Sequence, residues 1–546
     1  MTETNLSRRG FLTLGTVAAA TAAVGIAGCA PSANGGNEAS LPQAGASGAN
    51  DGPSFMQAPE PIDPSSITET HDYDVVVIGA GTAGVPAAIS AHKNGASVCV
   101  VQKELTPISQ GNTAAGIKLE GSDEAAIQHL ITRTLGENQY RSKRALLDLW
   151  AHRSGEAIEY MAEYSQGMEN APTLSKNDRY PDGYLPVEYP GTDLKVLTFS
   201  MRCGVKPICW QDGITTLAQA AEANGIDFFY ETPGVQLVQD DSGAVTGVIC
   251  QAKNGDYVQF NAAKGVVVAT GDYQNDEEMV AYYLPDMANF DKKQMNKTGD
   301  GHKMILWAGG QMERVGHTKM VHDFDSGPMF NEPFMAVKLS GERFCDEYID
   351  MSLINNFLIE DERPGYYCQI FDANYMRDVE NWGGKPTDPE ALAMYMPEED
   401  IAERTGVRPD LIATFKADTL DELATKLGIT DTSAFKAAVE RYNELCAKGA
   451  DDDFGKDPKY LKPVAQAPFY GIQKHVRLSA IVSGVNVDEE LRALREDGSP
   501  IEGLYVAGNT AGQFYSGVDY PLSIAGLSIG RAITFGYVAG ENAALR

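Results

Sequence analysis

The feature that most constrains the fold is a series of four local patterns directly after Tyr73. Residues 75–78 are four consecutive β-branched residues, residues 79–84 contain three glycines, residues 86–92 are rich in alanine, and residues 98–101 are again apolar. Short apolar runs of this kind predict buried strands of a parallel sheet, and the alanine-rich segment predicts a helix. The unit therefore predicts a strand, a tight turn, a helix and a second strand, which together begin an α/β fold.

The three glycines of the turn have the spacing of a dinucleotide site. Gly79 permits the tight turn, Gly81 lets the backbone approach a pyrophosphate, and Gly84 lets the helix pack closely on the strand. The phosphates would lie at the helix N-terminus, where unpaired N–H groups favour negative charge. A Gly-x-Gly-x-x-Gly sequence alone is weak evidence. Here it lies inside a complete strand–turn–helix–strand unit, so we expect a bound dinucleotide.

The residue expected to bind the adenosine ribose is an amide. Gln102 stands at the end of the second strand, where a carboxylate usually accepts hydrogen bonds from the ribose hydroxyls. An amide still hydrogen-bonds a hydroxyl but forms a weaker contact than a carboxylate does, and Glu104 lies two residues further on. The amide in place of a carboxylate weakens the predicted ribose site without removing it.

Later patterns favour a flavin over a nicotinamide. Residues 109–116 form a polar, glycine-containing loop that can offer backbone N–H groups to phosphates and to a ring edge. Simple nicotinamide enzymes rarely need such a loop. Alternating and apolar runs separated by turn signals predict further strands at residues 234–238, 245–250, 257–260, 265–269 and 503–509.

The N-terminus has the composition of an export signal. A charged segment with Arg8 and Arg9 precedes an apolar run, residues 15–28, that is too short to span a bilayer as a helix. The arginine pair resembles a twin-arginine signal, and residues 26–29 resemble a lipobox in which Cys29 becomes lipidated. An ordinary secretory signal and a chance cysteine are the alternatives. Twin-arginine export carries folded proteins, which agrees with a cofactor bound before export.

The composition of the chain argues against several classes of protein. The formal charge of −31 makes nucleic-acid binding through a basic patch improbable, because an acidic surface repels phosphate. Eight cysteines among 546 residues are too few for a disulfide scaffold, no CxxCH haem motif occurs, and no metal site is predicted. Residues 30–70 are rich in Pro, Gly and Ser and lack Lys and Arg, which predicts a disordered linker.

Taken together and in order, these motifs resemble the flavoproteins of the fumarate reductase and flavocytochrome c family, and equally the 3-ketosteroid dehydrogenases that share their fold. The matching elements are Gly79-x-Gly81-x-x-Gly84, Gly111-Asn112-Thr113, Ala269-Thr270-Gly271, Thr298-Gly299-Asp300-Gly301, Gly341-Glu342-Arg343-Phe344-x-Asp346-Glu347 and residues 503–509. The resemblance implies FAD as the cofactor. It also implies hydride transfer from flavin N5 to a C=C bond conjugated to a carbonyl or carboxylate, with a cap-domain side chain giving the proton.

The resemblance also implies a domain organisation. We expect an α/β protein with a Rossmann-like FAD-binding domain built from residues 71–314 and 481–546, and an inserted α+β capping domain at residues 315–480. A signal peptide, residues 1–29, and the linker precede these domains. The positions expected to hold FAD are Gly79, Gly81, Thr82, Ala83, Gly84, Gln102, Lys103, Gly111, Asn112, Thr113, Ala115, Gly116, Val235, Ala269, Thr270, Gly271, Asp300, Gly508, Asn509, Ser523, Gly526, Leu527 and Ser528.

The substrate positions of the dicarboxylate reductases are not retained. The family's proton-donating Arg corresponds to Met351, a family His aligns with Ala480, and the Arg that clamps a carboxylate falls on Tyr520. Each change removes a cation or a donor, and a buried carboxylate without a cation is costly. A pocket poor in cations and a mostly neutral substrate are therefore expected.

Tyr520, followed by Pro521 and a glycine-rich helix, resembles the 3-ketosteroid dehydrogenase pattern, in which the Tyr hydroxyl holds the substrate's carbonyl oxygen. A neutral donor there polarises an enone, so that the β-carbon accepts hydride. Core packing is the alternative for this tyrosine. The further candidates for proton transfer are Tyr348, Tyr515, Arg477 and His322.

We expect an exported, lipid-anchored FAD-dependent reductase of an activated C=C bond in an enone or enoate. Because the chain lacks haem motifs, electrons would come from a separate membrane-linked donor, a cytochrome or a quinol-linked protein. The alternatives are a 3-ketosteroid-type dehydrogenase working oxidatively, a fumarate- or urocanate-like carboxylate reductase, and a flavin-carrying electron-transfer lipoprotein without turnover.

Overall fold

The computed structural model describes residues 52–109, 111, 113–175, 180, 182–202, 210–314, 316–321, 327–329, 332–517, 519–521 and 523–546. Residues 52–546 form one compact unit. The predicted signal peptide with Cys29, and the candidate residues Asn112 and His322, lie outside the described residues.

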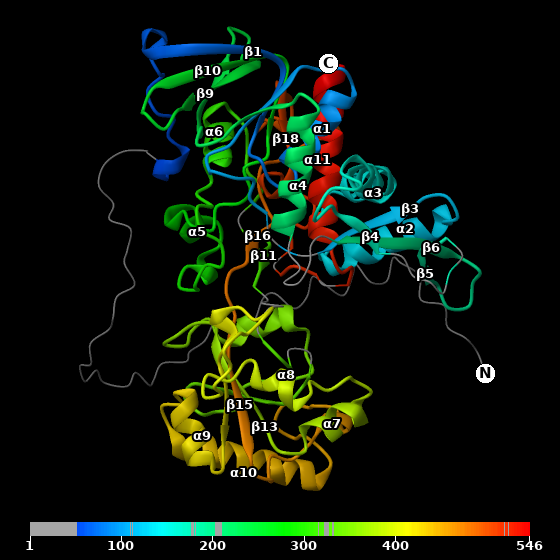
Figure 1. Ribbon diagram of the computed structural model, residues 1–546, viewed down its shortest axis with the longest axis vertical. Coiled ribbons are helices and arrows are strands. Elements are labelled where there is room, and N and C mark those ends of the chain that lie inside the picture. The colour runs from blue at the N-terminus through cyan, green and yellow to red at the C-terminus, as the bar shows by residue number, and fades with distance from the viewer. Residues whose placement is uncertain are drawn as a thin grey trace, which may run out of the picture. The chain divides into compact units, whose positions relative to one another are not determined.

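The centre of this unit is an eight-stranded sheet (Figure 1). Strands β18, β10, β1, β2 and β7 lie side by side and run parallel, and β17 pairs antiparallel with β18 at one edge. Strands β9 and β8 extend the sheet as an antiparallel pair beside β10. The strands are β1 (Ile67–Ile78), β2 (Val98–Val101), β7 (Asp227–Phe229), β8 (Gly234–Gln239), β9 (Val245–Gln251), β10 (Tyr257–Val268), β17 (Arg492–Leu494) and β18 (Pro500–Val506).

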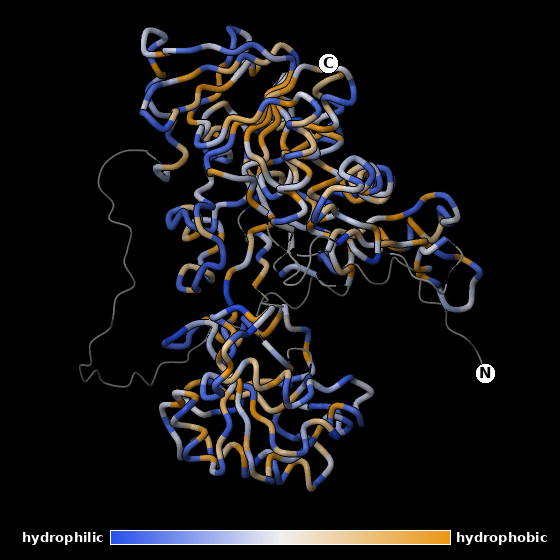
Figure 2. Tube along the Cα trace, viewed as in Figure 1, coloured by the Kyte–Doolittle hydropathy of each residue, from blue (hydrophilic) through white to orange (hydrophobic). Residues whose placement is uncertain are grey.

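The predicted strand–turn–helix–strand unit is confirmed as β1, α1 (Gly84–Lys93) and β2. Residues 75–78 and 98–101 are buried on both faces, as expected for central parallel strands. Figure 2 shows hydrophobic residues concentrated along these central strands. Burial of these apolar side chains stabilises the sheet by about 25 cal/mol for each Å² of apolar surface removed from water.

Helix α11 (Leu527–Leu545) packs against α1 through small residues. A Cβ on Gly536 would lie 2.0 Å from the Ala83 carbonyl oxygen, and one on Gly540 would lie 2.0 Å from that of Ala87. Both positions therefore require glycine for the two helices to approach this closely. This contact fixes the middle of α11 against the turn that follows β1, while Gly526 and Gly530 at its start pack on the backbone of Thr113 and Ala115 in β3 (Thr113–Lys118).

The other helices surround the central sheet and a second, four-stranded sheet. That second sheet is made from β3 (Thr113–Lys118), β4 (Thr173–Ser175), β5 (Leu185–Glu188) and β6 (Lys195–Arg202). The helices of this part are α2 (Glu124–Glu137), α3 (Arg144–Tyr164), α4 (Trp210–Ala223), α5 (Glu277–Tyr283) and α6 (Asp300–Trp307).

A third sheet lies within residues 335–475, inside the predicted capping domain. Its antiparallel strands, in spatial order, are β12 (Met335–Lys338), β13 (Tyr366–Phe371), β15 (Phe469–His475) and β14 (Thr414–Ala417). Its helices are α7 (Tyr375–Trp382), α8 (Pro389–Ala393), α9 (Leu420–Leu427) and α10 (Thr432–Lys448). Two short strands flank this segment, β11 (Lys319–Met320) before it and β16 (Ala480–Ile481) after it. They pair antiparallel with each other.

Three details differ from the sequence-based expectations. The strands predicted at residues 257–260 and 265–269 form one long strand, β10, which ends at Val268; its first half pairs with β9 and its second half with β18. Residues 386–448, whose helical periodicity and acid-rich caps predict a helical outer part of the cap, also contain one strand, β14. The predicted linker does not extend to residue 70, because Phe55 is buried against Tyr282 and Tyr283.

In the described part of the chain, no helix has the length and apolar character needed to cross a membrane.

Candidate active site

A cavity of about 1200 Å³ opens where the parallel strands of the central sheet end. Gly79 follows β1, Gln102 follows β2, Ala269 follows β10 and Gly508 lies just beyond β18, and all four line the cavity. Open α/β sheets bind nucleotides at these carboxyl ends. The volume exceeds the roughly 300–1,000 Å³ of ordinary small-ligand sites, so a dinucleotide and a second small molecule fit together.

The glycine turn fits a pyrophosphate. Gly79 has φ of +105°, and a Cβ there would lie 2.6 Å from the Ala269 carbonyl oxygen. A Cβ on Gly84 would lie 1.8 Å from the Gly79 carbonyl oxygen. Gly81 lines the cavity itself, so its missing side chain leaves the backbone open to a ligand. The turn therefore forms the cradle that a dinucleotide phosphate requires.

At the predicted ribose end, the Gln102 amide hydrogen-bonds the protein's own loops. Its Nε2 donates to the Thr106 carbonyl oxygen at 2.9 Å, and its Oε1 accepts from the Ala80 N–H at 3.3 Å. Lys103 forms an ion pair with Asp300 at 2.9 Å, and both side chains line the cavity. Glu104 also lines the cavity, so the charged residues beside Gln102 in the lining are Lys103 and Glu104, with Asp300 paired to Lys103.

The N-terminus of α11 forms the opposite part of the wall. Gly526 caps the helix with φ of +85°, and Ser528 in the first turn lines the cavity. The N–H groups and dipole of this 19-residue helix favour negative charge on a ligand. Asn509, which also lines the cavity, accepts a hydrogen bond from Arg531 Nη2 at 2.7 Å.

The predicted cofactor positions fall into two groups. Those that line the cavity are Gly79, Gly81, Thr82, Ala83, Gln102, Lys103, Gly111, Thr113, Ala269, Thr270, Gly271, Asp300, Gly508, Asn509, Gly526 and Ser528. Those described but outside the lining are Gly84, Ala115, Gly116, Val235, Ser523 and Leu527. Gly84 packs on the Gly79 backbone behind the wall, whereas Ser523 is exposed and donates to Glu137 at 2.6 Å.

The capping segment completes the cavity with aromatic and apolar side chains. The lining residues of this kind are Met320, Phe334, Tyr348, Ile349, Ile354 and Tyr367. Ala480, aligned with the family's His, also lines the cavity, and Met351 begins the short 3-10 helix Met351–Phe357. The same segment also contributes charged and polar lining residues, so an apolar or aromatic substrate body would lie beside charged groups. These residues are Glu332, Glu347, Asp350, Gln369 and Arg408.

Tyr520 presents a neutral hydroxyl at the junction of the two parts. The side chain is buried, it lines the cavity, and its oxygen accepts the Ser528 N–H at 3.1 Å. Burial raises the pKa of the Tyr520 hydroxyl, while the hydrogen bonds from Ser528 and Tyr515 and the charge of Arg531 oppose that rise. The hydroxyl is therefore protonated near neutral pH and is a competent hydrogen-bond donor.

The other proton-transfer candidates lie in different environments. Tyr348 lines the cavity, is 55% exposed, and stacks on Tyr460 at 4.0 Å between ring centroids. Tyr515 is fully buried behind Tyr520 and does not line the cavity. Arg477 pairs with Asp410 at 3.1 Å and also lies outside the lining. The structure thus brings Tyr520 and Tyr348 to the cavity but not Tyr515 or Arg477.

The expectation of a cavity poor in cations is wrong. Five basic side chains line it, and sequence comparison at three aligned positions could not reveal them because they come from other segments. They are Lys103, Arg202, Lys293, Lys297 and Arg408. Lys297 lies near Gly271 at the nucleotide end, where burial lowers its pKa and Asp272 opposes the change. The cavity can therefore neutralise a phosphate-containing cofactor.

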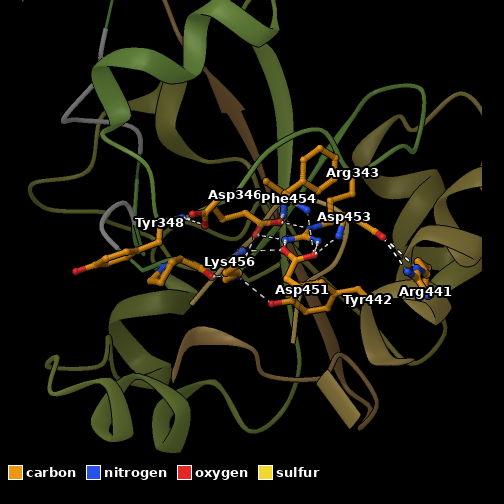
Figure 3. Close-up of polar contacts among 12 residues, drawn as sticks. Arg343, Asp346, Tyr348, Arg441, Tyr442, Asp451, Asp453, Phe454 and Lys456 are labelled. Atoms are coloured by element: carbon orange, nitrogen blue, oxygen red, sulfur yellow. Dashed lines mark hydrogen bonds and ion pairs between the residues drawn. The ribbon is translucent and has the colours of Figure 1, made fainter. Parts of the chain in front are cut away.

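The cap wall is braced by a buried network of charges (Figure 3). Arg343 forms paired hydrogen bonds with Glu347, at 2.8 and 2.9 Å, and with Asp451, at 3.0 and 2.7 Å. Lys456, fully buried, contacts Glu347 at 3.0 Å and Tyr442 at 2.9 Å. Glu347 lines the cavity, so this network fixes the segment that carries the neighbouring Tyr348.

The network keeps its carboxylates ionised. Although burial raises the pKa of Glu347, Lys456 and Arg343 hold it below its usual value. Burial likewise raises the pKa of Asp451, but hydrogen bonds from Arg343 and from backbone N–H groups lower it to about 2. Glu347 is therefore an anion that positions the wall rather than a proton donor.

Sequence reasoning missed several of these groups. Lys456 and Asp451 carry no local motif, and they meet Arg343 only through the fold. Arg531 had a signal, because it is the one basic residue in an otherwise uncharged apolar run, residues 526–540. A single basic residue in such an apolar run predicts a buried charge that is held by polar partners.

Comparison with known proteins agrees with this geometry. A family model described as "FAD binding domain" matches residues 74–522. The chain belongs to this FAD-binding family. A vinyl phenol reductase of Lactiplantibacillus plantarum is 27% identical over 508 residues, which cover 87% of this chain and 97% of that protein.

Solved structures show the same fold. The open conformation of a flavocytochrome c3 fumarate reductase has a TM-score of 0.64 and 23% identity, and covers 91% of this chain and 83% of that chain. A 3-ketosteroid Δ1-dehydrogenase of Sterolibacterium denitrificans has a TM-score of 0.66 and 19% identity, and covers 87% of this chain and all of that one.

FAD is therefore the cofactor of this protein, which is an oxidoreductase acting on carbon–carbon single or double bonds. The alternative of a flavin carrier without turnover is not retained. The mixed α/β fold with a Rossmann-like FAD domain and a capping domain is confirmed.

Proposed function

We propose that this protein reduces an activated C=C bond of a mostly neutral, conjugated substrate, with Tyr520 holding the substrate's carbonyl or phenol oxygen. The observation that carries this proposal is the buried Tyr520 hydroxyl, which lines the cavity and is oriented by the Ser528 N–H at 3.1 Å. The similarity to a vinyl phenol reductase supports the reductive direction, and it supports a neutral substrate because the substrate in that name has no carboxylate.

Bound FAD supplies the hydride for such a reduction. The residues of this chain contribute orientation and charge stabilisation. With an enone, the Tyr520 O–H donates to the carbonyl oxygen, where negative charge develops as the β-carbon accepts hydride. With a phenol, the same O–H binds the phenol oxygen and orients the ring. The aromatic lining, including Phe334 and Tyr367, holds the conjugated system in place and excludes water from it.

Tyr348 is our candidate for the residue that protonates the α-carbon. It carries an O–H group at the cavity wall, and its 55% exposure lets solvent return the proton after each turnover. The braced position of neighbouring Glu347 holds its backbone in place.

A second candidate function, reduction of a carboxylate-bearing enoate, is favoured by the basic residues of the cavity. Arg202 and Arg408 line it together with Tyr520, and guanidinium groups bind carboxylates in a bidentate manner. The oxidative reaction of a 3-ketosteroid-type dehydrogenase uses the same Tyr520 geometry in the reverse direction.

The test is an anaerobic reoxidation screen. FAD in the holoenzyme is reduced with one equivalent of dithionite and mixed with hydroxystyrenes, cyclic and steroid enones, cinnamates, urocanate or fumarate. We expect fastest reoxidation with a neutral substrate, and a loss of about 10²–10³-fold in Tyr520→Phe, the typical cost of removing one oxyanion donor.

Tyr515→Phe is the matched control, because Tyr515 lies behind the cavity wall. Its rate should fall by less than about tenfold, in keeping with the roughly 1 kcal/mol of one ordinary hydrogen bond. Fastest reoxidation by fumarate would favour the enoate function. Faster oxidation of a saturated ketone than reduction of its enone would favour the dehydrogenase, and a wild-type rate in Tyr520→Phe would refute the role of Tyr520.

We further propose that the enzyme is exported by the twin-arginine route, lipid-anchored at Cys29 and reduced by a separate cytochrome or quinol-linked donor. The support is the sequence of residues 7–29 and the lack of haem motifs. Fractionation of cells that express Cys29→Ala tests the anchor. Release of the variant from the membrane fraction is expected, and unchanged membrane association would count against the anchor.

A further inference from the structure

Arg531 is a charged residue buried in the wall behind the cofactor cavity. It lies in the second turn of α11, its side chain is fully buried, and Ile529 and Ala532 beside it line the cavity. Its guanidinium carbon lies 5.3 Å from the centre of the Tyr515 ring, 5.6 Å from that of Phe514 and 5.9 Å from that of Phe535. Three aromatic rings thus enclose the guanidinium.

The hydrogen-bond acceptors of Arg531 are neutral. Nη2 donates to Asn509 Oδ1 at 2.7 Å, and Nη1 donates to the Ala511 carbonyl oxygen at 3.3 Å. Among the described residues, no carboxylate oxygen lies within ion-pair distance of it, and Glu313 acts on it only at longer range. An arginine stays protonated in proteins, so this wall holds a buried positive charge without a direct counter-charge.

Arg531 also sets the orientation of Asn509. Arginine has only donors, so the amide oxygen of Asn509 must face it, and the amide NH₂ then faces away. Asn509 lines the cavity, and the hydrogen bonds found among the described residues give its NH₂ no acceptor. The amide therefore offers a donor to the cavity, where the resemblance implies that the family has a carboxylate.

These groups act together with the N-terminus of α11. Gly526 and Ser528 place the first turn of α11 on the same wall, where the Ser528 N–H donates to Tyr520, and Arg531 lies one turn further along the helix. A cation, an amide donor and the positive end of a helix dipole thus converge on one side of the cofactor. Such a wall stabilises negative charge more than it stabilises a neutral ring.

We propose that Arg531, with Asn509, raises the reduction potential of bound FAD by stabilising the anionic reduced form. Two electrons, one from each of two reduced viologen molecules, and one proton from solvent convert oxidised FAD to the singly protonated reduced flavin. The ring gains one negative charge, which the positive wall stabilises. Arg531 is a positioning and charge-tuning residue, since Asn509 lies between it and the cavity. The inference requires FAD but is independent of the substrate.

The test measures the midpoint potential of the holoenzyme by anaerobic titration against a reference dye. Arg531→Gln removes the charge, and Asn509→Asp neutralises it by forming an ion pair while the guanidinium stays in place. We expect each variant to decrease the ratio of reduced to oxidised FAD at a fixed potential by at least about tenfold, which is a shift of roughly 30 mV for two electrons.

Arg546→Gln is the control for loss of one positive charge, because Arg546 lies at the far end of α11 and contacts Lys264 and Glu502. In Arg546→Gln, the ratio of reduced to oxidised FAD at the same fixed potential should change by less than about twofold. If Arg531→Gln does not fold, the midpoint potential of Asn509→Asp alone tests the proposal. Unchanged potential in the variants that fold would overturn the proposal, even if turnover fell. Failure of the proposed substrate reaction would leave this measurement unaffected.

Discussion

The two walls of the cavity are built on different physical principles. On the cofactor side, the wall is backbone: glycines at 79 and 81, strand ends and the first turn of α11. On the cap side, the wall depends on buried charged side chains, with Arg343 at their centre. The first wall is defined by close backbone contacts, whereas the second depends on long-range pairing of ions. The two should therefore respond differently to substitution and to pH.

The largest effect is expected at Gly84. Gly84→Ala places a methyl group 1.8 Å from the Gly79 carbonyl oxygen, so the turn or α1 must move. Overpacking of this kind costs about 3 kcal/mol, or roughly a hundredfold in FAD affinity. The measurement is the dissociation constant of FAD, from flavin fluorescence, together with the FAD content of purified protein.

Gly136→Ala is the matched control. Gly136 lies in α2, and the nearest atom to its added Cβ is the Tyr140 hydroxyl at 4.0 Å. FAD affinity should stay unchanged, and stability should rise by up to about 1 kcal/mol. Retention of tight FAD binding in Gly84→Ala would show that the turn is more compliant than its contacts indicate.

The difference between the walls also explains what could be predicted from the sequence. The turn at residues 79–84 and its flanking strands are consecutive, so spacing and local propensity defined them. Tyr520 and Ser528 are eight residues apart, and the helix start between them could be predicted. Their proximity to the cavity follows from the resemblance to a known family.

The charge network could not be predicted in this way. Arg343 and Glu347 are four residues apart, but Asp451 and Lys456 come from a loop after α10 that contacts them only once the cap has folded. Acidic runs such as residues 451–453 ordinarily form a solvated surface, and no pattern marks Asp451 as the buried member. The ion pairs result from tertiary structure.

An effect of similar size, on the stability of the cap rather than on FAD affinity, is expected when the network loses its central cation. Arg343→Met leaves Glu347 and Asp451 buried with one fewer cation, which costs about 3–5 kcal/mol. Amide exchange in α10 of the cap should accelerate, while exchange in α1 and the FAD content stay near wild type. Hydrogen–deuterium exchange with mass spectrometry measures both helices in one experiment.

Arg441→Met is the control for this substitution, because Arg441 pairs with Asp453 at the half-exposed edge of the same region (Figure 3). Exposed ion pairs contribute about 0–1 kcal/mol, so exchange should hardly change. Equal effects of the two substitutions would mean that the buried pairing does not stabilise the cap. Loss of FAD in Arg343→Met would mean that the two walls are coupled.

The smallest effect is expected from acid. Asp451 has a pKa lowered to about 2, and the pKa of Glu347 is also below its usual value. A carboxyl whose pKa is depressed by folding stabilises the folded state above its unfolded pKa, near 4, and loses that contribution as the pH falls toward 2. The free energy of unfolding of the cap should therefore be constant from pH 7 to about 5 and decrease below pH 4. In Arg343→Met the decrease should be smaller, because the folded-state pKa of Asp451 then lies closer to its unfolded value and less stabilisation is lost in acid. Urea titrations at several pH values measure this profile. Identical profiles in the wild type and Arg343→Met would mean that the Arg343 ion pairs do not set the acid sensitivity of the cap.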